Sequence, residues 1–415
     1  MASTATLTAI SCAMVGSLLL VRRMAMLGDA ITHAALPGLA VAFLITGSRD
    51  TFPMLLGAVL AALATSVLAR WISAVGRVEE HASLGIVFTT LFAFGLVLMV
   101  RVADRVDLDP SCVLYGALEL TPLETVKVGG VAVPRAFLVN AGAAVMVAGV
   151  CALLHKEFLI SAFDPTTAAI QGFRPRVMDQ VVAALGALVA VAGFETVGSI
   201  LVVALLVVPA ATARLITSRF GPMMGLSVLL AAASVWLGHL GALELPKLAG
   251  FRDTNSAGMA AVAAGLLFGL ALFFSPEYGL VVRSVRAARL RYRIGLEDAL
   301  ASLYRREERG AHAAQAPSAF WLGRLRRRGW ISQDARGWRL TEEGLIQARA
   351  LIRSHRLWET FLVNRAKVPT DQAHIASERL EHVTPPGLRE SLDRDLSHPS
   401  RDPQGREIPR DHLHG

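Results

Sequence analysis

The stretch Phe268–Arg293, "FGLALFFSPEYGLVVRSVRAARLRYR", separates two parts of the chain that need different solvents. Its first half is mainly apolar, whereas five arginines stand in its last eleven residues. Across the 415 residues 53% are hydrophobic, more than is typical of a soluble domain, and these residues concentrate before Pro276. We therefore predict a membrane domain of about 280 residues followed by a soluble domain of about 130.

The charge of the chain, formally +8 with a pI near 10.0, suggests an anionic partner such as nucleic acid. Much of the excess, however, lies directly after the last apolar segment, where the positive-inside rule gives a simpler reason. The irregularly spaced Cys12, Cys112 and Cys151 predict neither a disulfide framework nor a thiolate metal site. An arginine pair follows the N-terminal apolar run, the reverse of a secretory signal, so this run is interpreted as the first span.

Apolar runs long enough to cross a bilayer predict an all-α polytopic membrane protein. Nine runs occur, two of them short: 5–21, 33–47, 54–75, 83–101, 136–154, 180–194, 197–215, 223–241 and 256–274. With the N-terminus outside, most basic residues near span ends fall in the cytoplasm, while Arg101 and Arg105 fall outside. The cytoplasmic set is Arg22, Arg23, Arg70, Arg77, Lys156, Arg174, Arg176, Arg214, Arg219 and the arginine-rich run from Arg283. This orientation also places the C-terminal domain in the cytoplasm. The abundant alanine and glycine allow close approach between helices.

Polar residues within or beside these spans are candidates for a transport pathway, because they are costly in hydrocarbon. Asp29 and His33 in "LGDAITHAALPG" are four residues apart on one helical face, and can form half of a divalent-cation site. The alternative is that Asp29 caps a helix while His33 satisfies a backbone carbonyl. Glu195 in "GFETVGS" lies at an external mouth, lines the pathway or is an exposed loop acid. Pro209 is expected to kink its helix.

A loop on the arginine-rich side contains "FDPTTAAIQGF", which predicts a short amphipathic helix. Asp164 is its expected N-cap, Pro165 its first helical residue and Gly172 its C-cap. A short capped helix between two spans suits docking onto a soluble partner. An interfacial helix without a partner is the alternative.

Four segments resemble the permease subunits of the manganese/zinc/iron uptake branch of ABC transporters: "RRMAMLGDAITHAALPGLAVAFL", "HASLGIVFTTLFAFGLVLM", "FDPTTAAIQGF" and "VGSILVVALLVVPAATARLIT". The closing "FGLALFFSPEYGL" is similar to that family's last span, and the motifs occur in order over about residues 8–282. The resemblance implies a type II importer permease of the bacterial inner membrane. It would pair with a second copy or a paralogous permease around a cation pathway.

The resemblance also implies two further partners, a cytoplasmic ATPase subunit and an extracytoplasmic metal-binding protein. The segment that matches the family's ATPase coupling helix has these expected contact residues: Phe163, Asp164, Pro165, Ala168 and Gly172. The segment matching Gly28–Gly38 lines the pathway in the family, which makes Asp29 and His33 its first candidates. The chain has no Walker motif (GxxxxGKS/T), so a separate chain is expected to bind and hydrolyse ATP.

The polar tail has the order of elements of a winged helix. "GLEDALASLYRREERG", from Gly295, predicts an amphipathic helix, and "APSAFWLGRLRRRGWI" predicts a second, strongly basic one. "SQDARGWRLTEEG" predicts a β-hairpin that leads through Thr341 into a capped helix. The arginine run either reads DNA or faces solvent or lipid headgroups.

Histidines and glutamates at helical spacing predict a metal site in the tail. In "HIASERLEH" four donors fall within an arc of roughly 100° on one helix: His374, Glu378, Glu381 and His382. In "SHRLWET", His355 and Glu359 are again four residues apart. Single pairs of this kind are mostly surface ion pairs, but six donors on two helices favour a metal, in one complete site or two partial ones. Imidazole and carboxylate without thiolate favour manganese or ferrous iron over structural zinc.

The tail resembles the DtxR/MntR-type metalloregulators through "HRLWETFLV", "HIASERLEHV" and "HPSRDPQGREIP". The residues that match one of that family's metal sites are Asp298, His355, Glu378, Glu381 and His382, and those that match the other are His355, Glu359 and His374. A carboxylate at Glu378, where iron-type members carry cysteine, is the manganese-type choice. Ala301 departs from the manganese-type pattern, which has a further glutamate there.

The helix-turn-helix also departs from that family. About eleven residues, "GAHAAQAPSAF", separate the two helices, so the support helix is expected to be short or absent, and Pro317 stands within it. We therefore favour metal sensing without DNA binding. The alternatives are a membrane-tethered, metal-dependent transcriptional regulator and a tail that only dimerises.

The predicted organisation has four parts: a permease domain at 1–282, a basic linker at 283–294, a winged-helix-like segment at 295–346 and a metal-binding and dimerisation domain at 347–415. The predicted function is that of the membrane subunit of an ABC importer for a divalent transition metal. Manganese is favoured, with iron or zinc as alternatives, and the tail is expected to bind metal and regulate transport.

Overall fold

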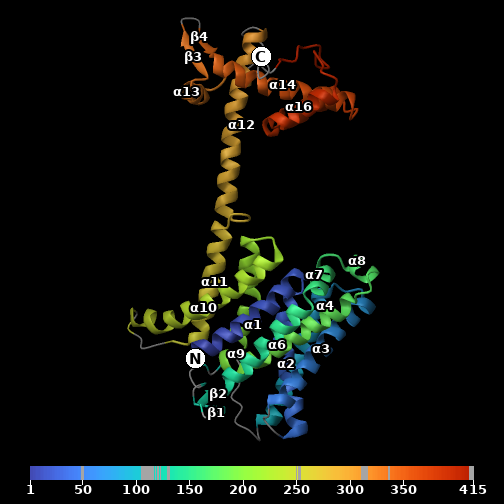
Figure 1. Ribbon diagram of the computed structural model, residues 1–415, viewed down its shortest axis with the longest axis vertical. Coiled ribbons are helices and arrows are strands. Elements are labelled where there is room, and N and C mark those ends of the chain that lie inside the picture. Colours follow the sequence, from blue (N-terminus) through green and yellow to red (C-terminus); the bar gives the residue numbers. More distant parts are fainter. Residues whose placement is uncertain are drawn as a thin grey trace. The chain divides into compact units, whose positions relative to one another are not determined.

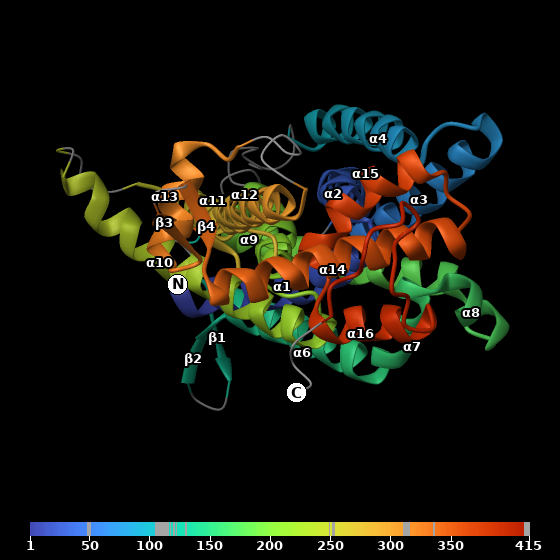
Figure 2. The same ribbon diagram turned by 90° about the horizontal axis from the view of Figure 1, so that it is seen from above.

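The computed structural model of the chain describes residues 1–47, 51–103, 116, 118, 121, 123–128, 131–248, 250, 254–309, 316–334 and 337–410. These residues belong to two compact units, Met1–Val282 and Arg283–Gly415. Helices dominate both units (Figures 1 and 2). The predicted all-α class is confirmed, and the sheets of the described residues are two hairpins of two strands each.

The first unit is a bundle of long apolar helices. Its elements are α1 (Ala2–Val21), α2 (Ala25–Thr46), α3 (Thr51–Gly76), α4 (Glu80–Ala103), β1 (Thr125–Val128), β2 (Val131–Pro134), α6 (Arg135–Leu153), α7 (His155–Phe163), α8 (Pro165–Ile170), α9 (Pro175–Ile216), α10 (Phe220–Leu248) and α11 (Ser256–Phe274). Nine helical segments of the described residues are long and apolar enough to cross a membrane, as predicted, and α9 supplies two of them. The two runs predicted as short are longer than expected, 22 residues from Ala25 and 20 from Pro175, because less apolar residues extend each helix at its start. The sequence reasoning did not predict the β1–β2 hairpin.

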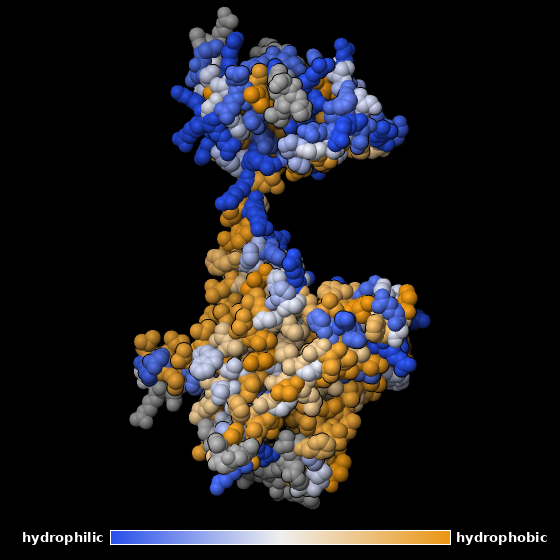
Figure 3. Space-filling view, viewed as in Figure 1, coloured by the Kyte–Doolittle hydropathy of each residue, from blue (hydrophilic) through white to orange (hydrophobic). Residues whose placement is uncertain are grey.

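Large apolar side chains project outward from this bundle, as hydrocarbon-facing residues do. They include Phe52, Trp71, Val145, Leu153, Leu229 and Leu266. On the face drawn in Figure 3, the surface of the first unit is largely hydrophobic, whereas that of the second unit is largely hydrophilic. The hydrophobic surface agrees with the predicted membrane domain, and the hydrophilic surface agrees with the predicted soluble domain.

Close backbone contacts hold α2 in the bundle, where it packs against α3, α4 and α9. At its crossing with α3, a Cβ atom on Gly38 would lie 2.4 Å from the carbonyl oxygen of Gly57. A Cβ atom on Gly57 would in turn lie 2.5 Å from the carbonyl oxygen of Gly38. Only residues without side chains allow this approach, which fixes the helix that carries Asp29 and His33.

The helix α9 is broken at Gly198, close to the boundary predicted between the apolar runs 180–194 and 197–215. Pro209 lies within the second of these runs, and its kink stays a prediction. Gly198 has φ 75° and ψ 164°, a conformation that strains residues other than glycine. Shortly before the break, Asn140 of α6 donates a hydrogen bond to the carbonyl of Ala192 (3.0 Å) and accepts one from Thr8 of α1 (2.7 Å). These buried polar bonds join three helices inside the bundle.

The second unit combines a winged-helix-like half with a helical half. Its elements are α12 (Leu280–Arg309), which begins at the end of the first unit, α13 (Ala319–Arg327), β3 (Ile331–Asp334), β4 (Gly337–Leu340), α14 (Glu342–Asn364), α15 (Thr370–Leu380), a 3₁₀ turn (Glu381–Val383) and α16 (Pro386–Asp395). The predicted basic helix and hairpin are present, and Thr341 caps α14 by accepting a hydrogen bond from the amide of Gly344 at 3.1 Å. Because α12 starts at Leu280 and not near Gly295, residues 283–294, predicted as a basic linker, are helical. Most of the segment expected to lack a support helix, residues 310–315, lies outside the described residues.

A buried arginine ties three segments of the second unit together. Arg356 of α14 is 2% exposed and forms a two-pronged ion pair with Glu308 of α12, at 3.0 and 2.6 Å. Its guanidinium also donates a hydrogen bond to the carbonyl of Glu407 and lies 3.9 Å from Asp402. The C-terminal segment, which carries Glu407 and Asp402, is thereby attached to both helices.

Candidate metal centre

Three predicted ligands meet where α15 packs against α14. His355 and Glu359 lie one turn apart on α14, and His374 lies in the first half of α15. His374 Nδ1 is 2.6 Å from Glu359 Oε1 and 3.2 Å from His355 Nε2. His355 Nε2 is also 3.3 Å from Glu359 Oε1. We call these three residues the α14–α15 triad.

Three further predicted ligands meet at the 3₁₀ turn that follows α15. This turn carries Glu381 and His382, and α12 contributes Asp298. His382 Nε2 lies 3.1 Å from Asp298 Oδ1 and 3.6 Å from Glu381 Oε1. We call this group the α12 triad. In each triad, one ligand atom per residue lies within 4.8 Å of the others, a spacing at which one ion could bind all three.

His355 connects the two triads. Its Nε2 belongs to the α14–α15 triad, while its Nδ1 lies 2.6 Å from Glu381 Oε2 of the α12 triad. The side chains of His374 and Asp298 are 37% and 59% exposed, whereas those of the other four members are 2–3% exposed. The arrangement therefore corresponds to two adjacent partial sites, each open to solvent on one side.

Glu378 and Ala301 lie outside both triads. The Glu378 side chain is 52% exposed, and its Oε1 atom is 3.6 Å from His374 Nε2. Ala301 is buried beside Leu351 and Ile352, in an apolar cluster. The structure thus brings together six of the seven predicted ligands, and the role of Glu378 stays a prediction.

The charged groups of the triads shift each other's pKa. Burial disfavours the charged form of His355, but contacts with Glu359 and Glu381 outweigh burial and raise its pKa. Burial likewise favours the neutral form of Glu359, yet its contacts with His355 and His374 lower its pKa to about 2. A metal ion that bound between these groups would therefore displace protons from the imidazoles.

Glu297 is a site residue that the sequence reasoning missed. Its Oε2 atom is 2.7 Å from His382 Nδ1, the ring nitrogen that does not face Asp298, and its Oε1 atom is 3.2 Å from Arg293 Nε. Burial disfavours the charge on His382, but Asp298 and Glu297 outweigh it and raise its pKa to about 9. A carboxylate on the far nitrogen of a ligating histidine orients the ring. The available signal was the position of Glu297 next to Asp298 and one turn after Arg293.

Gln404 is a second residue that the sequence reasoning missed. It belongs to "HPSRDPQGREIP" and donates a hydrogen bond from Nε2 to Glu359 Oε1 at 3.3 Å. Asp402 Oδ1 holds the turn by accepting from the amides of Gln404 (2.9 Å) and Arg406 (2.8 Å). No sequence spacing connects Gln404 with Glu359, because their contact arises from the fold of the C-terminal segment.

The donor atoms of the triads fit a divalent transition metal. Glu359 Oε2 is buried and has no hydrogen-bond partner among the residues that the structure describes. A buried carboxylate oxygen without a partner is costly, and a cation would satisfy it. Imidazole nitrogen and carboxylate oxygen suit manganese and ferrous iron, and they also bind zinc.

The first unit holds the Asp29–His33 pair on α2. His33 Nε2 lies 3.4 Å from Asp29 Oδ1, and the two side chains are 31% and 39% exposed. The imidazole stacks on Phe88, with ring centroids 5.9 Å apart, and meets Phe92 edge-on at 5.2 Å. Because α2 begins at Ala25, Asp29 is not a helix cap, and that alternative is wrong. No third donor joins the pair within the described parts of the chain, so it forms half of a site at most.

Glu195, the third pathway candidate, lies within α9 and not in a loop, so the loop alternative is wrong. Its side chain lies outside what the structure describes. The break at Gly198 follows it by one helical turn. Broken helices place free backbone groups next to ion sites in membrane transporters, but the role of Glu195 stays a prediction.

The helix α8 has the predicted start. Asp164 accepts a hydrogen bond from the amide of Thr167 at 2.9 Å, and Pro165 is the first helical residue. Hydrogen bonds from Thr167 hold the pKa of Asp164 below its usual value. The C-cap is Gln171, one residue earlier than predicted, and Gly172 follows with φ +87°. Ala168 is buried, whereas Phe163 next to the helix is 64% exposed. An apolar surface is therefore available at this short helix.

Comparison with known proteins decides the family. The ABC 3 transport family matches residues 1–275. The chain belongs to this family. The predicted resemblance of the first part of the chain to metal-uptake permeases is thereby confirmed.

The relatives of this ABC 3 family member include proteins that are named for metal transport. The manganese transport system membrane protein MntD of Bacillus subtilis (strain 168) is 36% identical over 285 residues, which are 68% of this chain and 94% of that protein. The structure of PsaBC from Streptococcus pneumoniae in complex with Fab covers 69% of this chain and 93% of its own, with a TM-score of 0.57 and 24% identity. This last likeness shows a shared fold.

The second unit of this ABC 3 family member has its own match. The metal binding and dimerisation domain of iron dependent repressors matches residues 341–410, which confirms the predicted resemblance of the tail. The manganese transport system membrane protein MntC of Bacillus subtilis (strain 168) is 28% identical over 392 residues, covering 89% of this chain and 85% of that protein. Similarity to that protein therefore continues beyond the permease part.

Proposed function

We propose that this ABC 3 family member is the membrane-spanning subunit of an importer for a divalent transition metal. The observation that carries the proposal is the family match over residues 1–275, among whose relatives are proteins named for manganese, zinc and iron transport. A transport subunit moves its cargo without transforming it. ATP binding and hydrolysis would come from a separate cytoplasmic ATPase subunit.

Manganese is the favoured metal, with iron or zinc as alternatives. The triads of the second unit offer imidazole and carboxylate donors, and hard oxygen ligands favour manganese or ferrous iron. These ligands bear on the metal that is sensed, and the cargo is inferred to be the same ion.

Asp29, His33 and Glu195 are the proposed pathway residues. A single Asp29–His33 pair offers two donors, which is too few for a closed site. A second copy of the chain, or a paralogous permease, would bring an equivalent pair across a dimer axis and raise the number of donors to four. The pair would then bind a dehydrated cation only in the assembled dimer.

The proposed partners meet the chain on opposite sides of the membrane. The short helix α8, with exposed Ile170 (81%) and with exposed Phe163 (64%) just before it, would insert into the ATPase as a coupling helix. An extracytoplasmic metal-binding protein would deliver the cation to the other side. The positive-inside rule supports a cytoplasmic position for α8 and the second unit in a bacterial inner membrane.

The second unit would sense intracellular metal and regulate transport. Asp298 of the α12 triad and its neighbour Glu297 stand on a helix whose first residue, Leu280, belongs to the first unit. Metal binding can change transport only if the affinity of the triads differs between transport states. This role requires no contact with DNA. We consider regulation of transcription by the metal-bound tail the less favoured alternative.

Metal uptake by a truncated chain tests the regulatory role. Cells that express the chain with its ATPase and binding protein take up labelled manganese, iron or zinc, and a variant without residues 290–415 is compared. We expect the truncated protein to import metal at the initial rate of the full chain, but to lose inhibition by accumulated metal. Unchanged inhibition would overturn the regulatory role and leave the transport role intact.

Footprinting tests the alternative of a membrane-tethered regulator. The purified full chain is incubated with the promoter region of its own gene, with and without manganese. We expect no protected sequence under either condition. Protection that requires manganese would move the target of the signal from the permease to DNA.

A further inference from the structure

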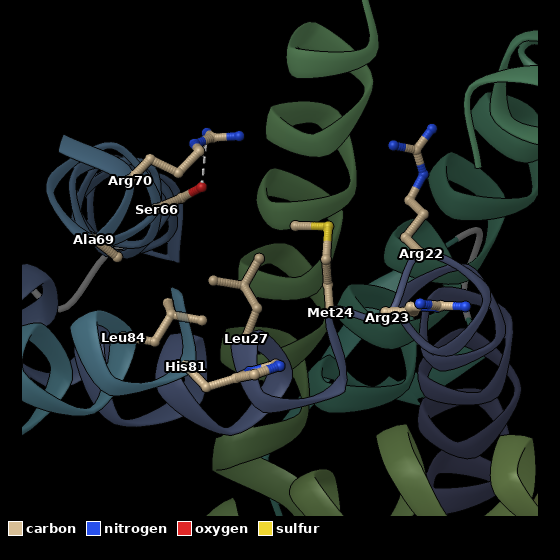
Figure 4. A pocket seen from close by; sticks show the side chains of 9 residues that line it. All are labelled: Arg22, Arg23, Met24, Leu27, Ser66, Ala69, Arg70, His81 and Leu84. Carbon is tan, nitrogen blue, oxygen red and sulfur yellow. Dashed lines mark hydrogen bonds between the residues drawn. The ribbon is translucent and has the colours of Figure 1, made fainter. Parts of the chain in front are cut away.

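A basic cavity lies in the first unit where α1 ends and α2 begins. Its volume is about 330 Å³, and helices α2, α3 and α4 and the end of α1 line it. The lining residues are Arg22, Arg23, Met24, Leu27, Ser66, Ala69, Arg70, His81 and Leu84. Figure 4 shows Arg70 and Ser66 on one side, Arg22 and Arg23 on the opposite side, and His81 and Leu27 between them.

The cavity carries more positive than negative charge. Arg22 and Arg70 share one carboxylate, Asp179, with which Arg22 forms an ion pair and to which Arg70 Nη1 lies at 3.6 Å. The Arg22 side chain is 3% exposed, and its Nε atom has no hydrogen-bond partner among the described residues. Arg23 is exposed and adds a further positive charge, while none of the lining residues is an acid.

Apart from Ser66 and His81, the rest of the lining is apolar, and it adjoins a hydrocarbon-facing surface. Leu27 and Leu84 are buried in the wall of the cavity, and Met24 stands beside them. Next to Arg70, Trp71 is 61% exposed and Val67 is 48% exposed, so α3 presents an apolar surface there. A tryptophan beside an arginine at the end of a span is typical of the membrane interface.

We propose that this cavity binds the phosphate ester headgroup of an anionic glycerophospholipid. Arg23 and Arg70 would hold the phosphate, as basic pockets between membrane helices do, while the acyl chains extend along the apolar surface of α3. Arg22, which is buried and bonded to Asp179 and Ser161, would add positive charge behind them. A free phosphate ester could use the same arginines, but it has no chains to cover Trp71 and Val67. The proposal is independent of the cargo, since it concerns neither Asp29 nor the triads.

Lipid retention by the purified full chain tests the proposal. The chain is reconstituted in nanodiscs of phosphatidylcholine with a minor share of phosphatidylglycerol, and the bound lipid is counted by native mass spectrometry. Arg23→Gln and Arg70→Gln should each lower phosphatidylglycerol binding about fivefold, whereas Arg23→Lys should retain it. Arg77→Gln is the matched control, because Arg77 is exposed near the end of α3 but does not line the cavity.

Each outcome either supports or overturns the proposal. Equal retention by Arg23→Gln and the unchanged chain would overturn it, and so would an equal loss in Arg77→Gln, which would indicate a diffuse surface attraction. A second arm adds glycerol phosphate and inorganic phosphate as competitors. If these displace the lipid at equal concentration, the cavity binds soluble phosphate esters and the lipid proposal fails. Because no transport is measured, these failures are distinguishable from a failure of the proposed importer function.

Discussion

Two regions of this protein offer nitrogen and oxygen donors to a cation, and they do so in different ways. In the first unit, Asp29 and His33 stand 3.4 Å apart on one helix, about a third exposed, without a further donor among the described residues. In the second unit, six donors from three segments form two connected triads, and most of them are buried. Carboxylates and amides outside the triads, such as Glu297 and Gln404, hold the donors in place.

The difference suggests two tasks. A site on a transport route must bind a cation well enough to take it up and weakly enough to release it, so an incomplete set of donors is an advantage. A sensing site has to retain its ion until the concentration falls, which requires several fixed ligands. The four predictions below test whether the two regions divide these tasks, beginning with the largest expected effect.

Replacing the carboxylate of the α2 pair should abolish transport without affecting the tail. Asp29→Asn keeps the side-chain volume but removes the charge, so we expect uptake to fall by more than the roughly 10- to 100-fold that outer-shell changes cause at metal sites. Uptake of labelled manganese measures this. His239→Asn is the control, since His239 is also a histidine of a span but pairs with Ser256 at 3.3 Å. Wild-type uptake by Asp29→Asn would remove the α2 pair from the pathway.

Loss of a buried triad carboxylate should weaken metal binding by the tail and leave initial uptake unchanged. Glu359→Gln is expected to lower manganese affinity more than about 100-fold, because Glu359 contacts both imidazoles of its triad. The exposed Glu378 provides the contrast, and Glu378→Gln should cost less than about tenfold. Calorimetric titration of both full-length variants measures the two affinities. Equal losses would show that Glu378 is a ligand that turns inward when the metal binds.

Replacing a residue that contacts a ligand but not the metal should have an intermediate effect on the manganese affinity of the tail. Glu297→Gln removes the charge that orients His382, and we expect manganese affinity to fall about 10- to 100-fold. Glu343→Gln, an exposed glutamate in the first turn of α14, is the matched control. The same titration serves for both variants. If Glu297→Gln binds as tightly as its control, the orientation of His382 does not depend on Glu297.

A side chain added at the α2–α3 crossing should lower the stability of the protein more than its affinity for manganese. Gly38→Ala places a methyl group 2.4 Å from the Gly57 carbonyl oxygen, which is expected to cost about 1–3 kcal/mol of unfolding free energy. Gly142→Ala on α6 is the control, because a Cβ there meets no atom within 4 Å. The thermal unfolding temperature of each variant in nanodiscs measures the difference. Equal unfolding temperatures would mean that α2 and α3 move apart without loss of stability, so that the backbone contact does not hold α2 in place.

Local patterns in the sequence predicted what local forces determine. Apolar runs gave the membrane-crossing helices, and the caps at Thr341 and Asp164 followed from side chains that bond their own helix. Helical spacing grouped His355 with Glu359 because both lie on α14. Each of these features is determined by residues within a few positions of it in the sequence.

Features that depend on distant segments could not be predicted in this way. Glu297 meets His382 across 85 positions of sequence, and Gln404 meets Glu359 across 45. The boundary predicted between the apolar runs 180–194 and 197–215 lies within a few residues of the break in α9, but no local pattern identified Gly198 itself. The Arg22–Asp179 ion pair of the basic cavity likewise joins residues 157 positions apart.

The buried Arg356 has a consequence for how the second unit unfolds. Its guanidinium forms an ion pair with Glu308 of α12 and donates a hydrogen bond to the carbonyl of Glu407, and the residue itself belongs to α14. Separating α12 from α14 would therefore leave a buried guanidinium without its two-pronged ion pair, at a cost of about 3–5 kcal/mol. Partial opening is therefore suppressed, and the slowest backbone amides of α12, α14 and the C-terminal segment should exchange with deuterium together. The unit is therefore expected to open as a single cooperative block.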